Sequence, residues 1–293
     1  MHMPKDIPWI NSNFLALSDT ESSLDIASAV LLPVPYDSTE SSIVGARYGP
    51  NAIIQSSSEL EDYDLELDAD VSNIGIYTSP YLEPHMGSPE LMAQRVQMAV
   101  EYYLDMGKLV GVLGGEHSVS IGSARAHQKY YPNVTVLYLD AHADLRDKYM
   151  GTKWGHASGA RRIHEQGNLV LAGVRSLCYE ERLYIDSNDV KCIFWPTEDP
   201  NYIDSILEYL SEQVYVSVDL DVLDPSIMSA VGNPEPGGMN WHDITNLIKH
   251  ISDNRQIVGF DVSELSPNQG PLSCSYTASK LVYKILAYAC SKG

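Results

Sequence analysis

Seven short runs of apolar and β-branched residues recur along the 293-residue chain. The runs are continuous rather than alternating, which is typical of strands whose two faces are both covered by other elements. They therefore predict a buried, mainly parallel sheet. The runs span residues 29–34, 109–113, 134–139, 169–174, 190–194, 214–218 and 257–262.

Stretches with helical character separate these runs. Strands that alternate with helices indicate an α/β protein with three αβα layers, in which helices flank a mainly parallel central sheet. No low-complexity linker or internal repeat interrupts the chain, so we expect residues 1–293 to form a single domain. The predicted helices span residues 89–106, 119–129, 202–211, 241–252 and 275–289.

The charge balance narrows the possible partners. With 39 acidic and 19 basic residues, the formal net charge is −20. This disfavours nucleic acid and anionic membranes, which need a basic surface, and favours a small cationic substrate or metal ions. The charge is equally compatible with a role in solubility alone.

Cysteine usage and hydropathy indicate a cytoplasmic protein. The four cysteines are scattered without a CxxC pair, which is neither a disulfide framework nor a zinc-finger pattern. The first 13 residues lack the apolar core of a signal peptide, and no apolar run approaches the length of a membrane span.

Residue types that bind metals follow directly after three of the predicted strands. If the extended geometry continues past each strand, alternating residues share one face. Three parallel strands lying side by side would then bring these side chains together at the carboxyl edge of the sheet. The candidate ligands are His117 after the run 109–113, Asp140, His142 and Asp144 after the run 134–139, and Asp219 and Asp221 after the run 214–218.

Four clustered carboxylates would repel one another and be costly to desolvate without cations. Two divalent cations would neutralise them, and such ions lie about 3.5–4 Å apart in two-metal sites, where they make water a nucleophile at neutral pH. Carboxylate and imidazole ligands without thiolate suit Mn²⁺, with Zn²⁺, Ni²⁺ or Co²⁺ as alternatives. Solvated loop aspartates would be the preferred interpretation of one Asp-x-Asp, but not of three such segments.

The same segments resemble the motifs of a known family. The order and spacing of five segments are similar to those of the ureohydrolases, the arginase and agmatinase family, over nearly the whole chain. The resemblance implies the arginase-like fold and a binuclear manganese enzyme that hydrolyses a guanidinium group to urea and an amine. The matching segments lie at 34–37 together with 45–50, and at 114–118, 139–146, 173–176 and 217–226.

The resemblance also implies how the ligands divide between the ions. By motif position, one metal would be held by His117, Asp140, Asp144 and Asp221. The other would be held by His142, Asp140, Asp219 and Asp221, which makes Asp140 and Asp221 the bridging residues.

Two further segments also resemble the family, 154–158 with His156 and 261–267 with Glu264. Catalytic roles are implied for Asp144, His156 and Glu264, of which His156 and Glu264 would also bind substrate. An imidazole can protonate the leaving amine, and a carboxylate can receive two parallel N–H bonds from a guanidinium. The alternatives are a surface-loop histidine and a helix-capping or surface glutamate. Asp261 fits the family better as a structural residue than as a ligand.

The substrate is less sharply defined than the reaction. Residues 235–238 resemble agmatinase-like members, which favours agmatine, hydrolysed to urea and putrescine. Ser229, Ala230 and Asn233 depart from the family pattern in a loop that would border the pocket. Aminopropylagmatine, guanidinobutyrate, guanidine or arginine therefore stay open as alternative substrates.

Two further hypotheses compete with a two-metal ureohydrolase. One is a single-zinc enzyme similar to the histone-deacetylase-like amidohydrolases, against which His117 and Asp144 argue. The other is a non-catalytic regulatory relative that binds polyamines. The family resemblance also implies a homo-oligomer, a trimer or a hexamer.

Overall fold

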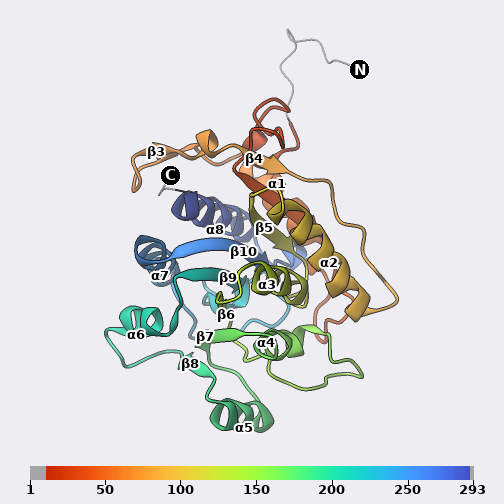
Figure 1. The fold of residues 1–293 in the computed structure, drawn as a ribbon, viewed down its shortest axis with the longest axis vertical. Coiled ribbons are helices and arrows are strands. Elements are labelled where there is room, and N and C mark those ends of the chain that lie inside the picture. The colour runs from red at the N-terminus through yellow and green to blue at the C-terminus, as the bar shows by residue number, and fades with distance from the viewer. Residues whose placement is uncertain (1–10, 291–293) are drawn as a thin grey trace.

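A computed structural model describes residues 11–290. Its centre is an eight-stranded sheet in the order β4-β1-β5-β10-β9-β6-β7-β8, with every neighbouring pair parallel (Figure 1). All seven predicted strands are confirmed. The strands are β1 (Ala29–Val34), β4 (Ile76–Thr78), β5 (Leu109–Gly114), β6 (Thr135–Leu139), β7 (Asn168–Val174), β8 (Lys191–Phe194), β9 (Gln213–Asp219) and β10 (Gln256–Ser263).

The sequence analysis did not predict two short strand pairings. Strand β4 has three residues, too few for a recognisable apolar run, and it extends the sheet beyond β1. Strands β2 (Tyr63–Asp64) and β3 (Ala69–Asp70) form a separate antiparallel pair. Neither affects the carboxyl edge at which the candidate ligands lie.

Helices cover both faces of the sheet, which confirms the three-layer αβα architecture (Figure 1). One face carries α1 (Gly49–Ser57), α6 (Tyr202–Tyr209), α7 (Trp241–Asn254) and α8 (Leu272–Cys290). The other carries α2 (Pro89–Leu104), α3 (Val119–Tyr130) and α4 (Gly159–His164), and α5 (Tyr179–Asn188) lies by the β8 edge. The predicted helices correspond to α2, α3, α6, α7 and α8, whereas α1, α4 and α5 were not predicted.

The strands are buried on both sides because successive side chains alternate between the two helical layers. In β6, Leu137 and Leu139 pack in the core under α6 to α8, whereas Val136 and Tyr138 pack in the core under α3 and α4. Burial of one such side chain stabilises the fold by roughly 1.5–3 kcal/mol. This double coverage is why the strands read as continuous apolar runs.

The expected single domain of residues 1–293 includes residues 1–10 and 291–293, which lie outside the described residues. None of the helices between residues 11 and 290 combines the length and the hydropathy needed to span a lipid bilayer. All four cysteines are described and carry free thiols.

The strand order corrects one expectation about the site. The three ligand-bearing strands do not lie side by side, because β10 is hydrogen-bonded between β5 and β9. The segment after β10 carries Glu264 into the same edge of the sheet. The centre of the sheet therefore brings four loops together, three with candidate ligands and one with the candidate guanidinium acceptor.

Candidate metal centre

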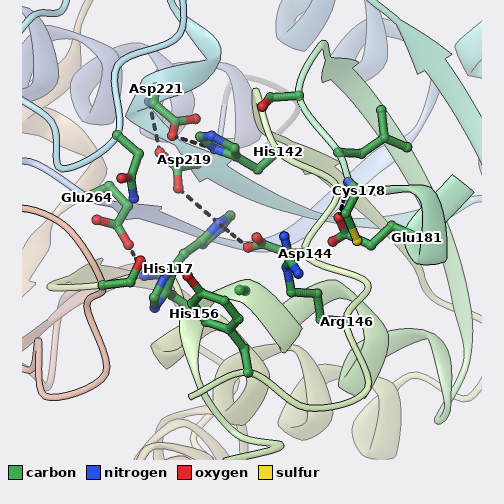
Figure 2. A pocket seen from close by; sticks show the side chains of 16 residues that line it. His117, His142, Asp144, Arg146, His156, Cys178, Glu181, Asp219, Asp221 and Glu264 are labelled. Carbon is green, nitrogen blue, oxygen red and sulfur yellow. Dashed lines mark hydrogen bonds and ion pairs between the residues drawn. The ribbon is translucent and has the colours of Figure 1, made fainter.

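The candidate ligands converge at the carboxyl ends of β5, β9 and β6 (Figure 2). They do not continue the extended geometry of the strands, as the sequence analysis expected. Strand β6 ends at Leu139, and the Asp140 carboxylate Oδ1 accepts a hydrogen bond from the His142 N–H at 2.6 Å. In the same way, Asp219 Oδ1 accepts a hydrogen bond from the Asp221 N–H at 2.8 Å, where a short 3₁₀ turn begins. In both segments an aspartate carboxylate thus accepts a hydrogen bond from the backbone N–H two residues later, which turns the chain at the end of the strand.

The ligand side chains form two groups that share Asp140. In one, His117 Nδ1 lies 2.9 Å from Asp140 Oδ2 and 3.2 Å from Asp219 Oδ2. In the other, His142 Nδ1 lies 2.9 Å from Asp221 Oδ2 and 3.5 Å from Asp140 Oδ1. Within each group the potential ligand atoms lie within 4.8 Å of one another, a spacing that one metal ion could bridge.

This grouping corrects the division of ligands inferred from motif position. Asp140 is shared, as expected, but Asp219 lies with His117 rather than with His142. Asp221 belongs to the group with His142 and not to the group with His117, whereas the motif positions implied that it bridges both. Asp219 ends β9 and Asp221 lies in the 3₁₀ turn that follows, so their carboxylates fall in different groups.

The charges and burial of this cluster fit divalent cations. The carboxylates of Asp140, Asp144, Asp219 and Asp221 are all at most 6% exposed. Burial, and then the charge of Asp140, raises the pKa of Asp144 well above its usual range. Burial and the charge of Asp221 do the same to the pKa of Asp219. In the absence of cations these buried acids would take up protons, and divalent metal ions would supply the positive charge that the cluster lacks.

A second layer of side chains orients His117. Its Nε2 lies 2.9 Å from Ser217 Oγ, which in turn donates to Asp261 Oδ1 at 3.0 Å. The Tyr138 ring stacks on the imidazole with centroids 4.2 Å apart. Holding the outer ring nitrogen directs Nδ1 at the carboxylates and fixes the tautomer suited to a metal ligand. Asp261 thus has the structural role expected of it.

A cavity of about 290 Å³ opens directly over both groups. Figure 2 shows that His156 and Glu264 approach it from the His117 side. The structure therefore brings together all the residues proposed from the sequence. The cavity wall consists of Ser41, His117, His142, Asp144, Arg146, Tyr149, His156, Ala157, Ser176, Leu177, Cys178, Glu181, Asp219, Asp221, Asn233 and Glu264.

His156 is 9% exposed and lies between two hydroxyl groups. Its Nε2 is 3.2 Å from Ser41 Oγ, its Nδ1 is 3.5 Å from Thr39 Oγ1, and its backbone N–H donates to Thr39 Oγ1 at 3.1 Å. Burial lowers the pKa of the imidazole to about 4. The ring is thus neutral near pH 7 and can accept a proton.

Glu264 is held by the loop after β5. Its backbone N–H donates to the Gly115 carbonyl at 2.8 Å, and its Oε1 accepts from the His117 N–H at 2.6 Å. Gly115 also permits the close approach of the backbone at Tyr36, because a Cβ there would stand 2.0 Å from the Tyr36 carbonyl oxygen. One hydrogen bond thus joins the carboxylate of Glu264, the candidate guanidinium acceptor, to the backbone of the candidate ligand His117.

Several cavity residues were not identified from the sequence. Ser41 lies in the N-terminal loop, Ser176 ends the family segment 173–176, and Cys178 and Glu181 lie at the start of α5; no catalytic role was inferred for any of them. Asn233 had been noted only as a departure from the family pattern. Their position in the cavity wall cannot be recognised from the neighbouring sequence, because only the tertiary fold decides which loops meet.

Arg175 explains why residues 173–176 matched a family segment. Its guanidinium donates to the backbone carbonyls of Asp221 at 2.7 Å and Glu235 at 2.8 Å. These bonds tie the turn that carries Asp221 to the loop that contains Asn233. Arg175 therefore shapes the cavity wall without entering it.

Comparison with known proteins places this geometry in context. The sequence profile described as the arginase family matches residues 27–288. The chain belongs to the arginase family. It is similar to an N(1)-aminopropylagmatine ureohydrolase of Synechocystis, with 34% identity over 98% of this chain and 97% of that protein. It is also similar to an agmatinase of Pyrococcus horikoshii, with 32% identity over 90% and 93% of the two chains.

Solved structures give the same result for the fold. The agmatine ureohydrolase of Thermoplasma volcanium matches with a TM-score of 0.85 at 32% identity, over 92% of this chain and 93% of that one. The arginase from Bacillus subtilis matches with a TM-score of 0.76 at 25% identity, over 88% and 98%. These likenesses confirm the expected family, arginase-like fold and enzyme class, an agmatinase-type ureohydrolase.

Proposed function

We propose that this protein hydrolyses a cationic guanidino compound to urea and an amine at a centre that binds two divalent metal ions. One observation carries the proposal: two ligand groups that share Asp140 lie under a single cavity that also receives His156 and Glu264. The additional group, with His117 and Asp219, favours two ions over the single zinc of the alternative hypothesis.

Glu264 would bind and orient the guanidinium. Its Oε2 accepts no hydrogen bond from residues 11–290, so that it is free to receive N–H groups of a substrate. A carboxylate can accept two parallel N–H bonds from the planar cation. Fixing the guanidinium plane in this way would present the central carbon to the attacking water. Glu264 would thus accelerate the reaction by orienting the substrate.

The metal ions would be held by His117, Asp140, Asp144 and Asp219 on one side and by Asp140, His142 and Asp221 on the other. When bound, they acidify water and stabilise negative charge at the reacting carbon. We propose Mn²⁺ as the resident metal, because the ligands are carboxylates and imidazoles without thiolate.

Proton transfer would be carried out by His156 and Asp144. Asp144 lines the cavity and accepts a hydrogen bond from the Tyr138 hydroxyl at 2.8 Å. It can accept a hydrogen bond from the attacking water. The neutral imidazole of His156 can take up the proton released on attack and deliver it to the departing amine nitrogen.

The substrate that we propose is agmatine or agmatine extended by an aminopropyl group. The relatives named as agmatinase and as N(1)-aminopropylagmatine ureohydrolase support this class. Both compounds are cations without a carboxylate, and the acidic chain would attract them. The experiment has to determine whether the preferred substrate carries the short amine tail of agmatine or the longer tail of aminopropylagmatine.

The decisive experiment is a urea-release assay on protein loaded with Mn²⁺, with metal content measured on the same sample. Agmatine, aminopropylagmatine, guanidinobutyrate, guanidine and arginine form the panel. We expect two ions per chain and the highest kcat/KM for one of the first two compounds. Absence of urea from every member would contradict the proposed function.

Replacing His156 by Gln is expected to lower kcat about 10²- to 10⁴-fold, because a positioned proton-transfer group contributes this much to catalysis. KM should rise less than kcat falls, because His156 also lines the substrate cavity, and metal content should change little. Steady-state urea release measures the effect, and addition of free imidazole should restore part of the rate.

The matched control is His164→Gln. His164 Nδ1 lies 2.8 Å from the Tyr184 hydroxyl, outside the cavity, so this variant should keep the wild-type kcat. If His156→Gln retained full kcat, the proton-transfer role would have to be assigned to another group.

A further inference from the structure

Glu40 is an acidic residue to which neither the motifs nor the proposed reaction assigns a role. It follows Thr39 in the N-terminal loop that contacts His156. Both of its carboxylate oxygens are inaccessible to water, and neither accepts a hydrogen bond of good geometry from residues 11–290. A buried carboxylate in this state is costly unless a positive charge compensates it.

The neighbouring charges do not compensate Glu40. Asp37 is the close partner of the Arg47 guanidinium, and Glu116 accepts hydrogen bonds from Thr39. Burial, followed by the charges of Asp37 and Glu116, raises the pKa of Glu40 to about 8, which outweighs the lowering effects of the nearby Ala46 N–H and Arg47. The loop therefore contains a carboxylate that lacks its cation.

Gly232 lies between the carboxylates of Glu40 and Glu264, at the edge of the cavity that Glu264 lines. A Cβ at Gly232 would stand 3.7 Å from Glu264 Oε2, 4.0 Å from Glu40 Oε2 and 3.3 Å from the Ile43 carbonyl oxygen. All three nearest atoms are thus hydrogen-bond acceptors, and two of them belong to carboxylates. Glu264 is 6% exposed and lines the cavity, and burial, followed by the charges of Asp219 and Glu40, raises its pKa well above the usual range.

We propose that Glu40 is a specificity-determining residue that, together with Glu264, selects a cationic group bound beside Gly232. The occupant is the guanidinium of the substrate, so the inference rests on the proposed function and deepens it. Glu264 contacts the cation, and Glu40 adds a second negative charge across the short space over Gly232. Because Glu40 is shielded from water, its charge acts through a low dielectric and discriminates cations from neutral molecules of the same shape.

Guanidinium and urea provide a matched pair of probes, because they are planar, of similar size, and differ in charge. Their dissociation constants are measured by isothermal titration calorimetry on Mn²⁺-loaded wild type and on Glu40→Gln, at about pH 9, above the Glu40 pKa of about 8. We expect Glu40→Gln to weaken guanidinium binding about tenfold. Urea binding should change less than about twofold, because urea carries no net charge.

Two further variants separate charge from structure. Glu59→Gln, which neutralises an exposed glutamate, should leave both affinities unchanged. Gly232→Ala keeps both carboxylates but fills the space between them, so it should weaken binding of guanidinium as well. The melting temperature of Glu40→Gln should equal or exceed that of wild type, since the variant removes an uncompensated buried acid.

Equal guanidinium affinity of wild type and Glu40→Gln, or no guanidinium binding by wild type, would overturn the inference. A lower melting temperature with equal losses for guanidinium and urea would show a structural role instead and would also overturn it. The proposed function fails separately: wild type that binds guanidinium through Glu40 yet releases no urea would refute the reaction and leave the charge selection standing.

Discussion

Asp140→Asn is expected to remove nearly all urea release and to empty the metal centre. Asp140 is the residue that both ligand groups share, with Oδ2 facing His117 Nδ1 at 2.9 Å and Oδ1 facing His142 Nδ1 at 3.5 Å. Loss of a residue that only supports a metal ligand costs 10- to 100-fold in affinity or activity. A shared ligand should therefore cost at least about a hundredfold in metal affinity, with a larger loss of kcat.

The measurement combines metal analysis after gel filtration with urea release at saturating substrate. Asp147→Asn is the matched control, because Asp147 lies in the loop after Asp144 and forms surface ion pairs with Lys153 and Arg162. This control should keep two ions per chain and wild-type turnover. An Asp140→Asn variant that retained both would refute the shared-ligand geometry.

Glu264→Gln is expected to lower kcat/KM about thirty- to several-thousand-fold while metal content stays unchanged. Truncating one partner of a buried, hydrogen-bonded charge pair costs about 2–5 kcal/mol, which corresponds to that range at about 1.4 kcal/mol per factor of ten. Glutamine preserves the oxygen that accepts the His117 N–H, so the loop after β5 should keep its position.

Steady-state kinetics with agmatine or its aminopropyl derivative test this expectation, and inductively coupled plasma analysis monitors the metals. Glu180→Gln, on the exposed start of α5 one residue before the cavity residue Glu181, provides the control and should behave as wild type. A small effect on kcat/KM would mean that another carboxylate binds the guanidinium. Loss of metal from Glu264→Gln would instead show that Glu264 positions the candidate metal ligand His117.

The buried carboxylates explain both why the centre needs cations and why it can bind metal ions. Asp144 and Asp219 are buried next to further carboxylates, and their raised pKa values mark a cluster that binds either protons or metal ions. The imidazole of His142 is perturbed as well. Although burial lowers its pKa, the hydrogen bonds to Asp140 and Asp221 raise it to about 12. Groups perturbed in this way at the carboxyl edge of a parallel sheet are typical of a functional site.

The sequence by itself determined which segments carry the chemistry. Continuous apolar runs predicted all seven long strands, because each strand packs against helices on both faces and must be apolar throughout. Candidate ligands from His117 to Asp221 were identifiable since each follows such a run, and His156 and Glu264 since they stand in recognisable family segments. These are local properties, fixed by burial and by the order of residues along the chain.

Only the tertiary structure decided how those segments meet. The insertion of β10 between β5 and β9, the turn that separates Asp219 from Asp221, and the approach of Glu40 to Glu264 over Gly232 all depend on contacts between distant parts of the chain. The lateral order of parallel strands and the meeting of loops follow from how helices pack on the finished sheet. No single segment records that packing, so the ligand grouping and the cavity wall could not be inferred from residue pattern alone.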